Sequence, residues 1–189
     1  MVTAADPHAS DEASRWVVRF APLVNPGGRV LDVASGRGRH ARLFANLGMH
    51  VVAIDRDHDA LAALSAERNV TTRALDLEGD TWPLSGERFD AIVVTHYLHR
   101  PRLTDLLASL ADDGVLIYET FAAGNEAYGR PSNPAFLLER DELLSLARDR
   151  LVIVAFEQGL VERSTGKAVV QRIAAVGRSR GWPPLLSSS

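Results

Sequence analysis

Apolar residues recur along the chain in two spacings, and the alternation of the two predicts an α/β protein. Continuous apolar runs that are too short for a helix and rich in β-branched residues predict buried strands. These runs are residues 30–34, 50–54, 70–75, 89–95 and 115–120. Between them, apolar residues at helical spacing predict helices over residues 41–47, 60–68 and 103–110. Strands that alternate with helices form a parallel sheet with helices packed on its faces.

A further helix is predicted ahead of the first strand. Its apolar residues fall near one face over residues 13–21, and Ser10 or Asp11 suits the N-cap position. We expect Trp16 to pack on that face. Asp57 is the predicted N-cap of the helix that follows the second strand.

The end of the chain departs from the alternation of strands and helices. The apolar runs 151–157 and 168–176 are separated by a turn near residues 164–167 and not by a helix. Strands joined in this way are antiparallel, so the parallel sheet is expected to end in a hairpin. We expect one domain over residues 10–176, with a flexible arm at 1–9 and a flexible tail at 177–189.

The most informative stretch is a glycine turn between the first strand and its helix. Ser35-Gly36-Arg37-Gly38 follows an apolar run, and its glycines permit backbone angles that a Cβ disfavours. The second strand ends on Asp55. Parallel strands place the turn and this acid at the same carboxyl edge, where ligands of doubly wound folds bind. A carboxylate there suits the vicinal hydroxyls of a ribose, so the unit predicts a ligand that contains a nucleoside.

Composition narrows the classes of function. Apolar residues make up 46% of the chain and charged ones 24%, which is ordinary for a soluble globular protein. A formal net charge of −3 gives no overall attraction to nucleic acid or to an anionic membrane. The absence of cysteine excludes disulfides, thiolate metal ligands and a cysteine nucleophile. No apolar run approaches the ~20 residues of a membrane span, and the first residues lack a secretion signal, so a cytoplasmic location is expected.

The residues around the turn suggest a family. The string Asp-x-Ala-Ser-Gly-x-Gly over residues 32–38 resembles the D-x-G-x-G-x-G signature of class I S-adenosylmethionine-dependent methyltransferases, with Ala34 in place of the first glycine. The loose dinucleotide pattern Gly36-x-Gly38-x-x-Ala41 fits as well, and alone it is a weak match. The Phe89-Asp90 pair ahead of a strand and the final hairpin also resemble the methyltransferase plan.

The resemblance covers about residues 16–176 and is closest to the small, tellurite-resistance-type group of the family. It implies an α/β fold: a Rossmann-like, doubly wound, mostly parallel seven-stranded sheet that ends in an antiparallel β-hairpin. It implies S-adenosyl-L-methionine as cofactor and S-adenosyl-L-homocysteine as product. It also implies that Asp76, at the end of the third strand, receives the adenine amino group. The candidate cofactor-binding residues are Asp32, Ala34, Ser35, Gly36, Gly38, Asp55, Arg56, Asp76, Leu77 and Thr95.

Candidate acceptor contacts follow the fourth and fifth strands. Methyl transfer from a sulfonium requires alignment and exclusion of water, and a base only where the acceptor arrives protonated. His96 is the candidate base, and packing or binding is the alternative role for it. Residues 121–134 form a long segment with little periodicity, which is typical of a functional loop. The candidate substrate-binding residues are Tyr97, His99, Tyr118, Glu119, Tyr128, Arg130 and Asn133. No metal is expected, because His96 and His99 have no evident third ligand.

Three functions remain open at this stage. The first is a methyltransferase that acts on a small-molecule acceptor of unknown identity, as a monomer or homodimer, with no nucleic-acid or membrane partner expected. The second is a methyltransferase that acts on RNA or protein, which requires a basic surface beside the cleft. The third is a non-methylating nucleotide-binding protein of Rossmann-like fold, either an oxidoreductase or a regulatory binder.

Overall fold

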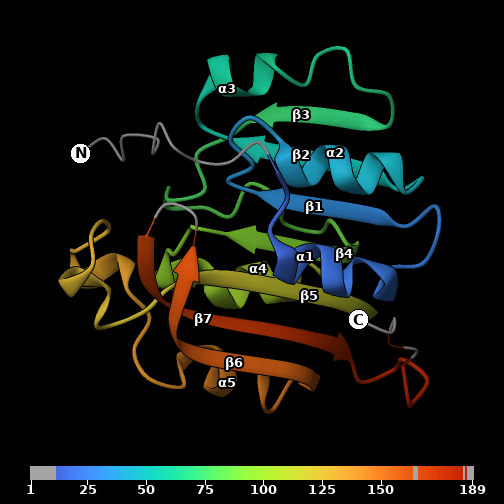
Figure 1. Cartoon of the computed structure of the whole chain (residues 1–189). Coiled ribbons are helices and arrows are strands. Elements are labelled where there is room, and N and C mark those ends of the chain that lie inside the picture. Colours follow the sequence, from blue (N-terminus) through green and yellow to red (C-terminus); the bar gives the residue numbers. More distant parts are fainter. Residues whose placement is uncertain (1–11, 164–165, 185, 187–189) are drawn as a thin grey trace.

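A single mixed sheet runs through the molecule and carries helices on both faces (Figure 1). The structure is a computed structural model that describes residues 12–163, 166–184 and 186. Among these residues, seven strands pair in the order β3-β2-β1-β4-β5-β7-β6. The strands are β1 Arg29–Val33, β2 His50–Asp55, β3 Val70–Ala74, β4 Phe89–Thr95, β5 Leu110–Phe121, β6 Leu151–Arg163 and β7 Gly166–Gly177.

The pairing of the strands confirms the predicted fold class. Strands β1 to β5 run parallel to one another. β7 then runs antiparallel to β5, and β6 runs antiparallel to β7 at the edge of the sheet. The strands of the hairpin are longer than the two predicted apolar runs: β6 extends to Arg163, and β7 begins at Gly166. Of its predicted turn, Ser164 and Thr165 lie outside the described residues.

The helices cover both faces of the sheet, as expected of a doubly wound fold. The α-helices are α1 Arg15–Phe20, α2 Arg39–Asn46, α3 His58–Ala62, α4 Leu103–Ala108 and α5 Glu142–Ala147. Short 3₁₀ turns are η1 Ala21–Leu23, η2 Arg100–Arg102, η3 Asn125–Ala127 and η4 Pro134–Phe136. Apolar residues of α1, α2 and α3 belong to one buried cluster, and those of α4 and α5 belong to the other.

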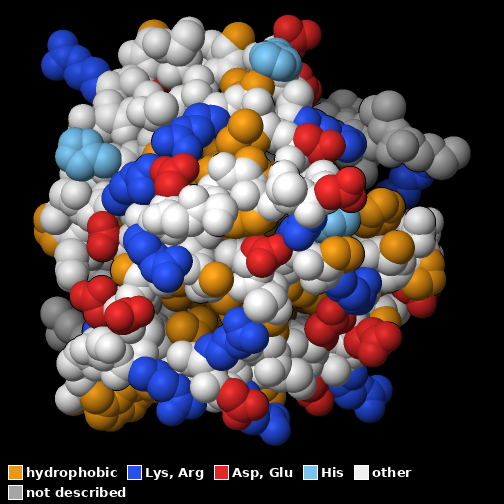
Figure 2. Space-filling view, turned by 180° about the vertical axis from the view of Figure 1, so that it is seen from behind, with side chains coloured by type: hydrophobic (Ala, Val, Ile, Leu, Met, Phe, Trp, Pro, Cys, Tyr) orange, Lys and Arg blue, Asp and Glu red, His pale blue; other side chains and the backbone are white. Residues whose placement is uncertain are grey.

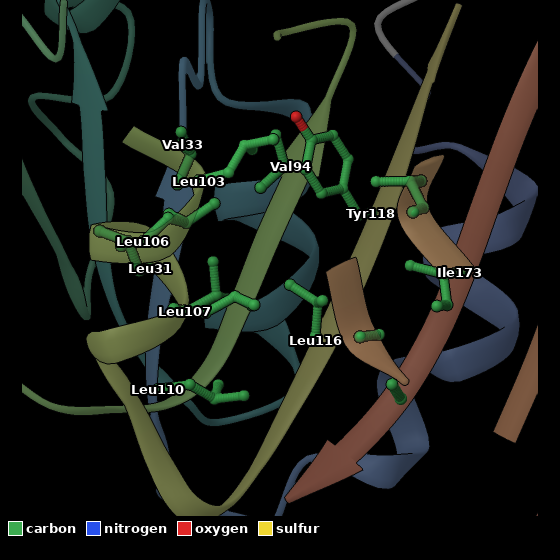
Figure 3. Packing of buried hydrophobic residues seen from close by; sticks show 14 of the residues in the cluster. Leu31, Val33, Val94, Leu103, Leu106, Leu107, Leu110, Leu116, Tyr118 and Ile173 are labelled. Atoms are coloured by element: carbon green, nitrogen blue, oxygen red, sulfur yellow. The ribbon is translucent and has the colours of Figure 1, made fainter. Parts of the chain in front are cut away.

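Alternation along the strands divides the core between these two clusters. On β1, Val30 packs toward α1 and α2, whereas Leu31 and Val33 pack toward α4, because successive side chains of a strand point to opposite faces. Figure 3 shows the second cluster, in which Leu103, Leu106 and Leu107 of α4 lie over Leu31 and Val94. The sheet is therefore covered on both sides, which explains why its central strands are continuous apolar runs.

Several element boundaries differ from the sequence-based predictions. The first helix begins at Arg15 with Ser14 as its N-cap, and the predicted caps Ser10 and Asp11 lie outside the described residues. The third helix ends at Ala62 and not near residue 68, although Asp57 caps it as predicted. Helix α4 ends at Ala108 and not near residue 110, because Leu110 is the first residue of β5 and pairs with Phe89 of β4.

The sequence Asp112-Asp113-Gly114 predicts a turn ahead of the fifth strand, because Asp-Gly pairs favour turns. This prediction is wrong, because these residues lie within β5. The register places Leu110 opposite Phe89 and Val115 opposite Ala91, so the residues between Leu110 and Val115 form an irregular bulge in a continuous strand. The main-chain oxygen of Asp112 accepts a hydrogen bond of 3.2 Å from Ser179 N. The bulge is thus held against the residues that follow β7.

Charges of both signs are interspersed on the face seen in Figure 2, over which no large patch of one sign extends. This distribution agrees with the small net charge of −3. No helix formed by the described residues has the length and apolar character needed to cross a membrane.

Candidate active site

The candidate site lies where the chain changes direction across the sheet. From β1 the chain continues to β2 and β3 on one side, and from β4 it continues to β5 on the other. Ligands of doubly wound sheets bind at the carboxyl edge beside such a switch point. The glycine turn follows Val33 at the end of β1, and His96 follows Thr95 at the end of β4. Asp55 ends β2 and Glu119 lies near the end of β5, at the same edge.

The glycine turn has a left-handed backbone at three positions. Ala34, Gly36 and Gly38 have φ angles of 52°, 53° and 81°. A Cβ on Gly38 would lie 2.4 Å from side-chain carbons of Leu64, so both conformation and space require glycine there. Ala34 adopts the left-handed region with a side chain, which costs about 1–2 kcal/mol. The position where the family signature has its first glycine is therefore a strained one in this chain.

Asp55 is held in place by two main-chain N–H groups. Its Oδ2 accepts a hydrogen bond of 2.8 Å from Gly36 N, and its Oδ1 accepts one of 2.9 Å from Asp57 N. Each carboxylate oxygen keeps a further lone pair, and the side chain is half-buried. The carboxylate is thus preorganised against the glycine turn and still able to accept hydrogen bonds from a ligand.

A second carboxylate lies beyond the end of β3. Asp76 is exposed, and its Oδ1 accepts a hydrogen bond of 2.9 Å from Glu78 N. Between these two residues, Leu77 is buried in the core and anchors the segment. Arg56 is exposed beside Asp55. The segment leaves Asp76 Oδ2 available for a donor such as an exocyclic amine.

Asp32 is a carboxyl group buried inside β1. It is 1% exposed, and its Oδ2 has no hydrogen-bond partner among the described residues. Burial raises its pKa from 3.8 to about 7, against the opposing effects of the Ala41 N–H and the charge of Arg39. A buried carboxyl without a full set of partners is costly unless a ligand or water satisfies it.

Two other buried polar atoms near the switch point have no hydrogen-bond partner in the described part of the chain. They are Ser35 Oγ in the glycine turn and the Tyr97 hydroxyl beyond β4. Burial raises the pKa of Tyr97, and the nearby carboxylates of Glu78 and Asp76 raise it further. Together with Asp32, these atoms line the carboxyl edge with hydrogen-bonding capacity that the fold leaves unused. That chemistry fits a polar ligand such as S-adenosylmethionine.

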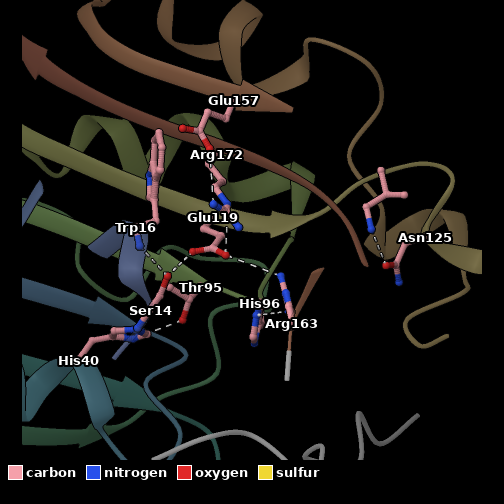
Figure 4. Close-up of polar contacts among 11 residues, drawn as sticks. Ser14, Trp16, His40, Thr95, His96, Glu119, Asn125, Glu157, Arg163 and Arg172 are labelled. Atoms are coloured by element: carbon pink, nitrogen blue, oxygen red, sulfur yellow. Dashed lines mark hydrogen bonds and ion pairs between the residues drawn. The ribbon is translucent and has the colours of Figure 1, made fainter. Parts of the chain in front are cut away.

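A buried histidine that sequence reasoning missed joins the first helix to β4 (Figure 4). Ser14 N donates a hydrogen bond of 3.1 Å to His40 Nε2, which must therefore lack a proton. His40 Nδ1 then carries the proton and faces Thr95 Oγ1 at 3.4 Å. Burial, together with the charges of Arg39 and His96, lowers the pKa of His40 to about 3. His40 is accordingly a neutral structural link behind the site.

His96 has an unusual backbone and an exposed side chain. Its φ angle is 54°, and its ring stacks on Phe121 with 5.0 Å between ring centroids. Nε2 lies 3.4 Å from Arg163 Nη1, and because a guanidinium only donates, Nε2 accepts in this contact. The structure thus places the predicted base at the carboxyl end of β4, with its ring oriented by Phe121 and Arg163.

The predicted acceptor residues fall into separate environments. Tyr118 is completely buried, and its hydroxyl donates a hydrogen bond of 2.9 Å to Tyr97 O, so its side chain belongs to the core. Tyr97 and His99 are half-buried after β4. Tyr128, Arg130 and Asn133 are exposed.

The segment that carries those exposed residues is held in place by Asn125. This buried side chain donates from Nδ2 to Pro131 O at 3.0 Å and accepts at Oδ1 from Val169 N at 3.0 Å. Glu119, another predicted acceptor residue, lies beside His96, whose main-chain N–H donates to Glu119 O at 3.0 Å. The structure therefore separates a fixed group at the carboxyl ends of β4 and β5 from a solvent-facing group on the 121–134 segment.

Glu119 is the centre of a charged cluster that sequence analysis did not predict. Its side chain is 6% exposed, and Oε1 lies 3.4 Å from Arg172 Nε and 3.7 Å from Arg163 Nη2. Oε2 accepts a hydrogen bond from the Ser14 hydroxyl. A charged residue within a buried strand was the available signal for Arg172, which lies between Gln171 and Ile173. No local signal pointed to Arg163.

Metal-ligating side chains do not gather at this edge. Among the described residues, no group of three or more His, Asp or Glu side chains is placed to hold a metal ion.

Comparisons with known proteins agree with this geometry. Residues 30–112 match the family model described as a methyltransferase domain. Among curated proteins, the chain is similar to protein-L-isoaspartate O-methyltransferase of Klebsiella pneumoniae, with 35% identity over 112 residues. That alignment covers 53% of this chain and 51% of that protein. The chain spans about half the length of the curated relatives it matches.

Solved structures share the fold. TehB from Haemophilus influenzae has a TM-score of 0.72 at 20% identity, and the match covers 86% of this chain and 61% of TehB. A 1,6-didemethyltoxoflavin-N1-methyltransferase from Burkholderia thailandensis, solved with S-adenosylhomocysteine bound, has a TM-score of 0.62 at 24% identity over 86% of this chain and 76% of that one. The match over residues 30–112 is thus to a methyltransferase domain, and the chain has the fold of the class I S-adenosylmethionine-dependent methyltransferases.

Proposed function

We propose that the protein is an S-adenosylmethionine-dependent methyltransferase that acts on a small-molecule acceptor. One observation carries the proposal: the Asp55 carboxylate accepts a hydrogen bond of 2.8 Å from Gly36 N at the switch point of the sheet. This contact fixes an acid beside a turn whose backbone a ligand can approach closely. Charge-assisted hydrogen bonds from two ribose hydroxyls to such a carboxylate stabilise binding by about 1.5–3 kcal/mol each.

The remaining candidate residues divide between the two ends of the cofactor. Asp55 receives the ribose hydroxyls, and Asp76 receives the adenine amino group through its available Oδ2. The turn from Ala34 to Gly38, with Asp32 and Ser35, faces the methionine end, where a carboxyl and a hydroxyl lack partners among the described residues. When bound, S-adenosylmethionine supplies an electrophilic methyl group on a sulfonium.

The protein itself contributes alignment, exclusion of water and, for a protonated acceptor, a base. His96 is the proposed base, because its imidazole is exposed at the carboxyl end of β4 and its ring is fixed on Phe121. Its Nε2 takes the proton when the acceptor replaces the 3.4 Å contact with Arg163. Thr95 Oγ1 contacts Nδ1 of the buried His40, and this contact holds the end of β4 against α2. Tyr97 and His99 lie on the segment that follows β4.

The cofactor assignment is tested by titration calorimetry with S-adenosylhomocysteine and, separately, with NAD. We expect S-adenosylhomocysteine to bind and NAD to give no measurable heat. Binding of NAD in preference to S-adenosylhomocysteine would show a nucleotide-binding protein of another kind. Acceptors are then sought by a thermal-shift screen of small molecules in the presence of S-adenosylhomocysteine, followed by mass spectrometry for a gain of one methyl group.

A second candidate function follows from the names of the curated relatives. Each of those relatives is a protein-L-isoaspartate O-methyltransferase, and the identity over about half of each chain favours a protein carboxyl group as an alternative acceptor. A peptide that contains one isoaspartyl residue, compared with its aspartyl isomer, tests this alternative. Methyl incorporation into the isoaspartyl peptide alone would favour the protein acceptor.

A further inference from the structure

We propose that Arg163 and Arg172 bind the carboxylate of the methyl acceptor beside His96. The proposal rests on the proposed function and deepens it, because it assigns the acceptor an anionic group. The two arginines come from the two strands of the final hairpin, and Figure 4 shows both of them directed at Glu119.

The first support is incomplete hydrogen bonding in a buried place. Arg163 Nη2 and Arg172 Nε are buried and make no hydrogen bond within the described residues. Glu119 Oε1 is near both, at 3.7 and 3.4 Å, but outside hydrogen-bond geometry. Guanidinium N–H groups that have lost water and gained no acceptor are costly. A second carboxylate that reached these groups from the edge of the sheet would supply the acceptors that Glu119 does not.

The second support is an excess of positive charge. Arg163 and Arg172 share Glu119, and the charge of Arg39 is close enough to Arg163 to contribute to the lowering of its pKa. Glu157, at 3.5 Å from Arg172 Nη1, is the other carboxylate in contact with the cluster. Glu157 is shared in turn with Arg19, whose Nη1 lies 3.5 Å from Oε1. The ion pairs of Arg163, Arg172 and Arg19 thus set three guanidinium groups against two carboxylates, which leaves one positive charge.

The third support is the position of the cluster at the carboxyl edge. Arg172 pairs with Glu119 across β5 and β7, which fixes it at the end of β5. Arg163 ends β6, with its guanidinium over the Phe121 ring at 5.2 Å and beside His96 Nε2 at 3.4 Å. The hairpin therefore directs its cationic groups to the edge where the proposed base and the glycine turn lie.

The chemistry favours a carboxylate over other acceptor groups. The planar fork of arginine matches a carboxylate or a phosphate with two parallel hydrogen bonds. One excess positive charge balances a singly charged carboxylate, whereas a phosphate dianion would overcompensate it. A cationic acceptor, such as an alkylammonium, would be repelled by Arg163 and Arg172. The cluster therefore selects small acids, or an acidic side chain of a peptide, by the same contacts.

The test measures anion binding directly and needs no turnover. The arginine Nε–Hε signals of the full chain, loaded with S-adenosylhomocysteine, are followed by ¹⁵N NMR during titration with benzoate, benzamide or inorganic phosphate. We expect benzoate to shift the Arg163 and Arg172 signals with saturation, and the neutral isostere benzamide to leave them in place. An isoaspartyl peptide forms a further arm that separates a peptide carboxylate from a small acid.

Variants link the binding to the cluster. We expect Arg163→Met to weaken benzoate binding at least tenfold and Arg163→Lys to weaken it less, because lysine keeps the charge and loses the fork. Arg178→Met is the matched control: Arg178 is exposed beyond the end of β7, at the opposite edge, where it donates to Arg148 O. The control is expected to bind benzoate as the unmodified protein does. All three variants are expected to retain S-adenosylhomocysteine affinity.

The outcomes separate the two proposals. Shifts that are equal for benzoate and benzamide, or unchanged benzoate affinity in Arg163→Met, would overturn the carboxylate site while the methyltransferase assignment stands. Tighter binding of phosphate than of benzoate would overturn the choice of a carboxylate. Failure of the unmodified protein to bind S-adenosylhomocysteine would overturn the proposed function, and the acceptor assignment with it.

Discussion

The main-chain N–H of Gly36 donates a 2.8 Å hydrogen bond to Asp55 Oδ2, and this bond joins the turn after β1 to the end of β2. Asp57 N occupies the other carboxylate oxygen at 2.9 Å. Because both donors belong to the main chain, the carboxylate has its orientation before any ligand arrives. Preorganisation of this kind reduces the conformational entropy lost on binding.

Removal of this carboxylate is expected to impair cofactor binding. Asp55→Ala should weaken S-adenosylhomocysteine affinity by tenfold or more, since charge-assisted bonds to the ribose are worth about 1.5–3 kcal/mol each. Titration calorimetry measures the change. Asp57→Ala is the control: it removes the N-cap of α3, at a cost of about 1 kcal/mol in stability, and should leave the affinity unchanged. Equal loss of affinity in both variants would remove Asp55 from the cofactor site.

A glycine at position 34 is expected to stabilise the fold. Ala34 has a φ of 52°, and relief of this strain returns about 1–2 kcal/mol, of which the greater entropy of the unfolded glycine chain offsets about 0.4–1 kcal/mol. Ala34→Gly should therefore raise the free energy of unfolding by roughly 0.5–1 kcal/mol in urea denaturation. Ala45→Gly, within α2, should lower it by about 0.5–1 kcal/mol or more. A loss of stability in Ala34→Gly would contradict the strain.

The buried histidine link predicts a dependence of stability on pH. Burial lowers the pKa of His40 from 6.5 to about 3, so between these values the unfolded chain binds a proton that the folded protein does not. Stability should therefore fall as pH falls from about 6.5 toward 3, by up to about 1.4 kcal/mol per pH unit from this residue. His40→Gln should lack this component. Parallel pH profiles for the two proteins in urea denaturation would argue against a neutral buried His40.

Asp32 is expected to act on stability in the opposite direction. Its folded-state pKa is raised from 3.8 to about 7, so the folded protein binds the additional proton between these values. The ligand-free protein should lose stability from this residue as pH rises from about 4 to about 7, by up to about 1.4 kcal/mol per pH unit. Asp32→Asn should remove that loss, so its advantage in unfolding free energy should grow with pH. A constant difference between the two proteins would place an ionised Asp32 in the folded state.

Local sequence patterns predicted the strands well and the ends of the helices less well. The strand over residues 89–95 was predicted with the bounds that the structure has, because a continuous apolar run between polar residues defines a buried strand. Helix ends depend on distant partners. Ser14 caps α1 while its hydroxyl donates to Glu119, a residue 105 positions away, and no local pattern reports that contact.

The candidate site divides in the same way. The glycine turn and Asp55 belong to one strand-turn-helix-strand unit, so their spacing in the sequence already indicated their proximity. His40 was overlooked because the predicted buried face of its helix was defined by apolar residues alone, and a histidine beside Arg39 gave no sign of burial. Arg163 and Arg172 reach the site through the hairpin register with β5, and the register is a tertiary property.

The placement of Trp16 gives the molecule an intrinsic optical probe. Its indole Nε1 donates to Ile173 O at 3.3 Å, and the guanidinium of Arg172 lies 5.8 Å from the ring centroid. The emission of an indole is sensitive to nearby charge, so any anion that neutralises Arg172 should change the fluorescence of Trp16. Trp182 is 66% exposed and emits at longer wavelength, whereas Trp82 is half-buried. In a Trp82→Phe variant, the blue edge of the spectrum would therefore report on Arg172 with little contribution from Trp182.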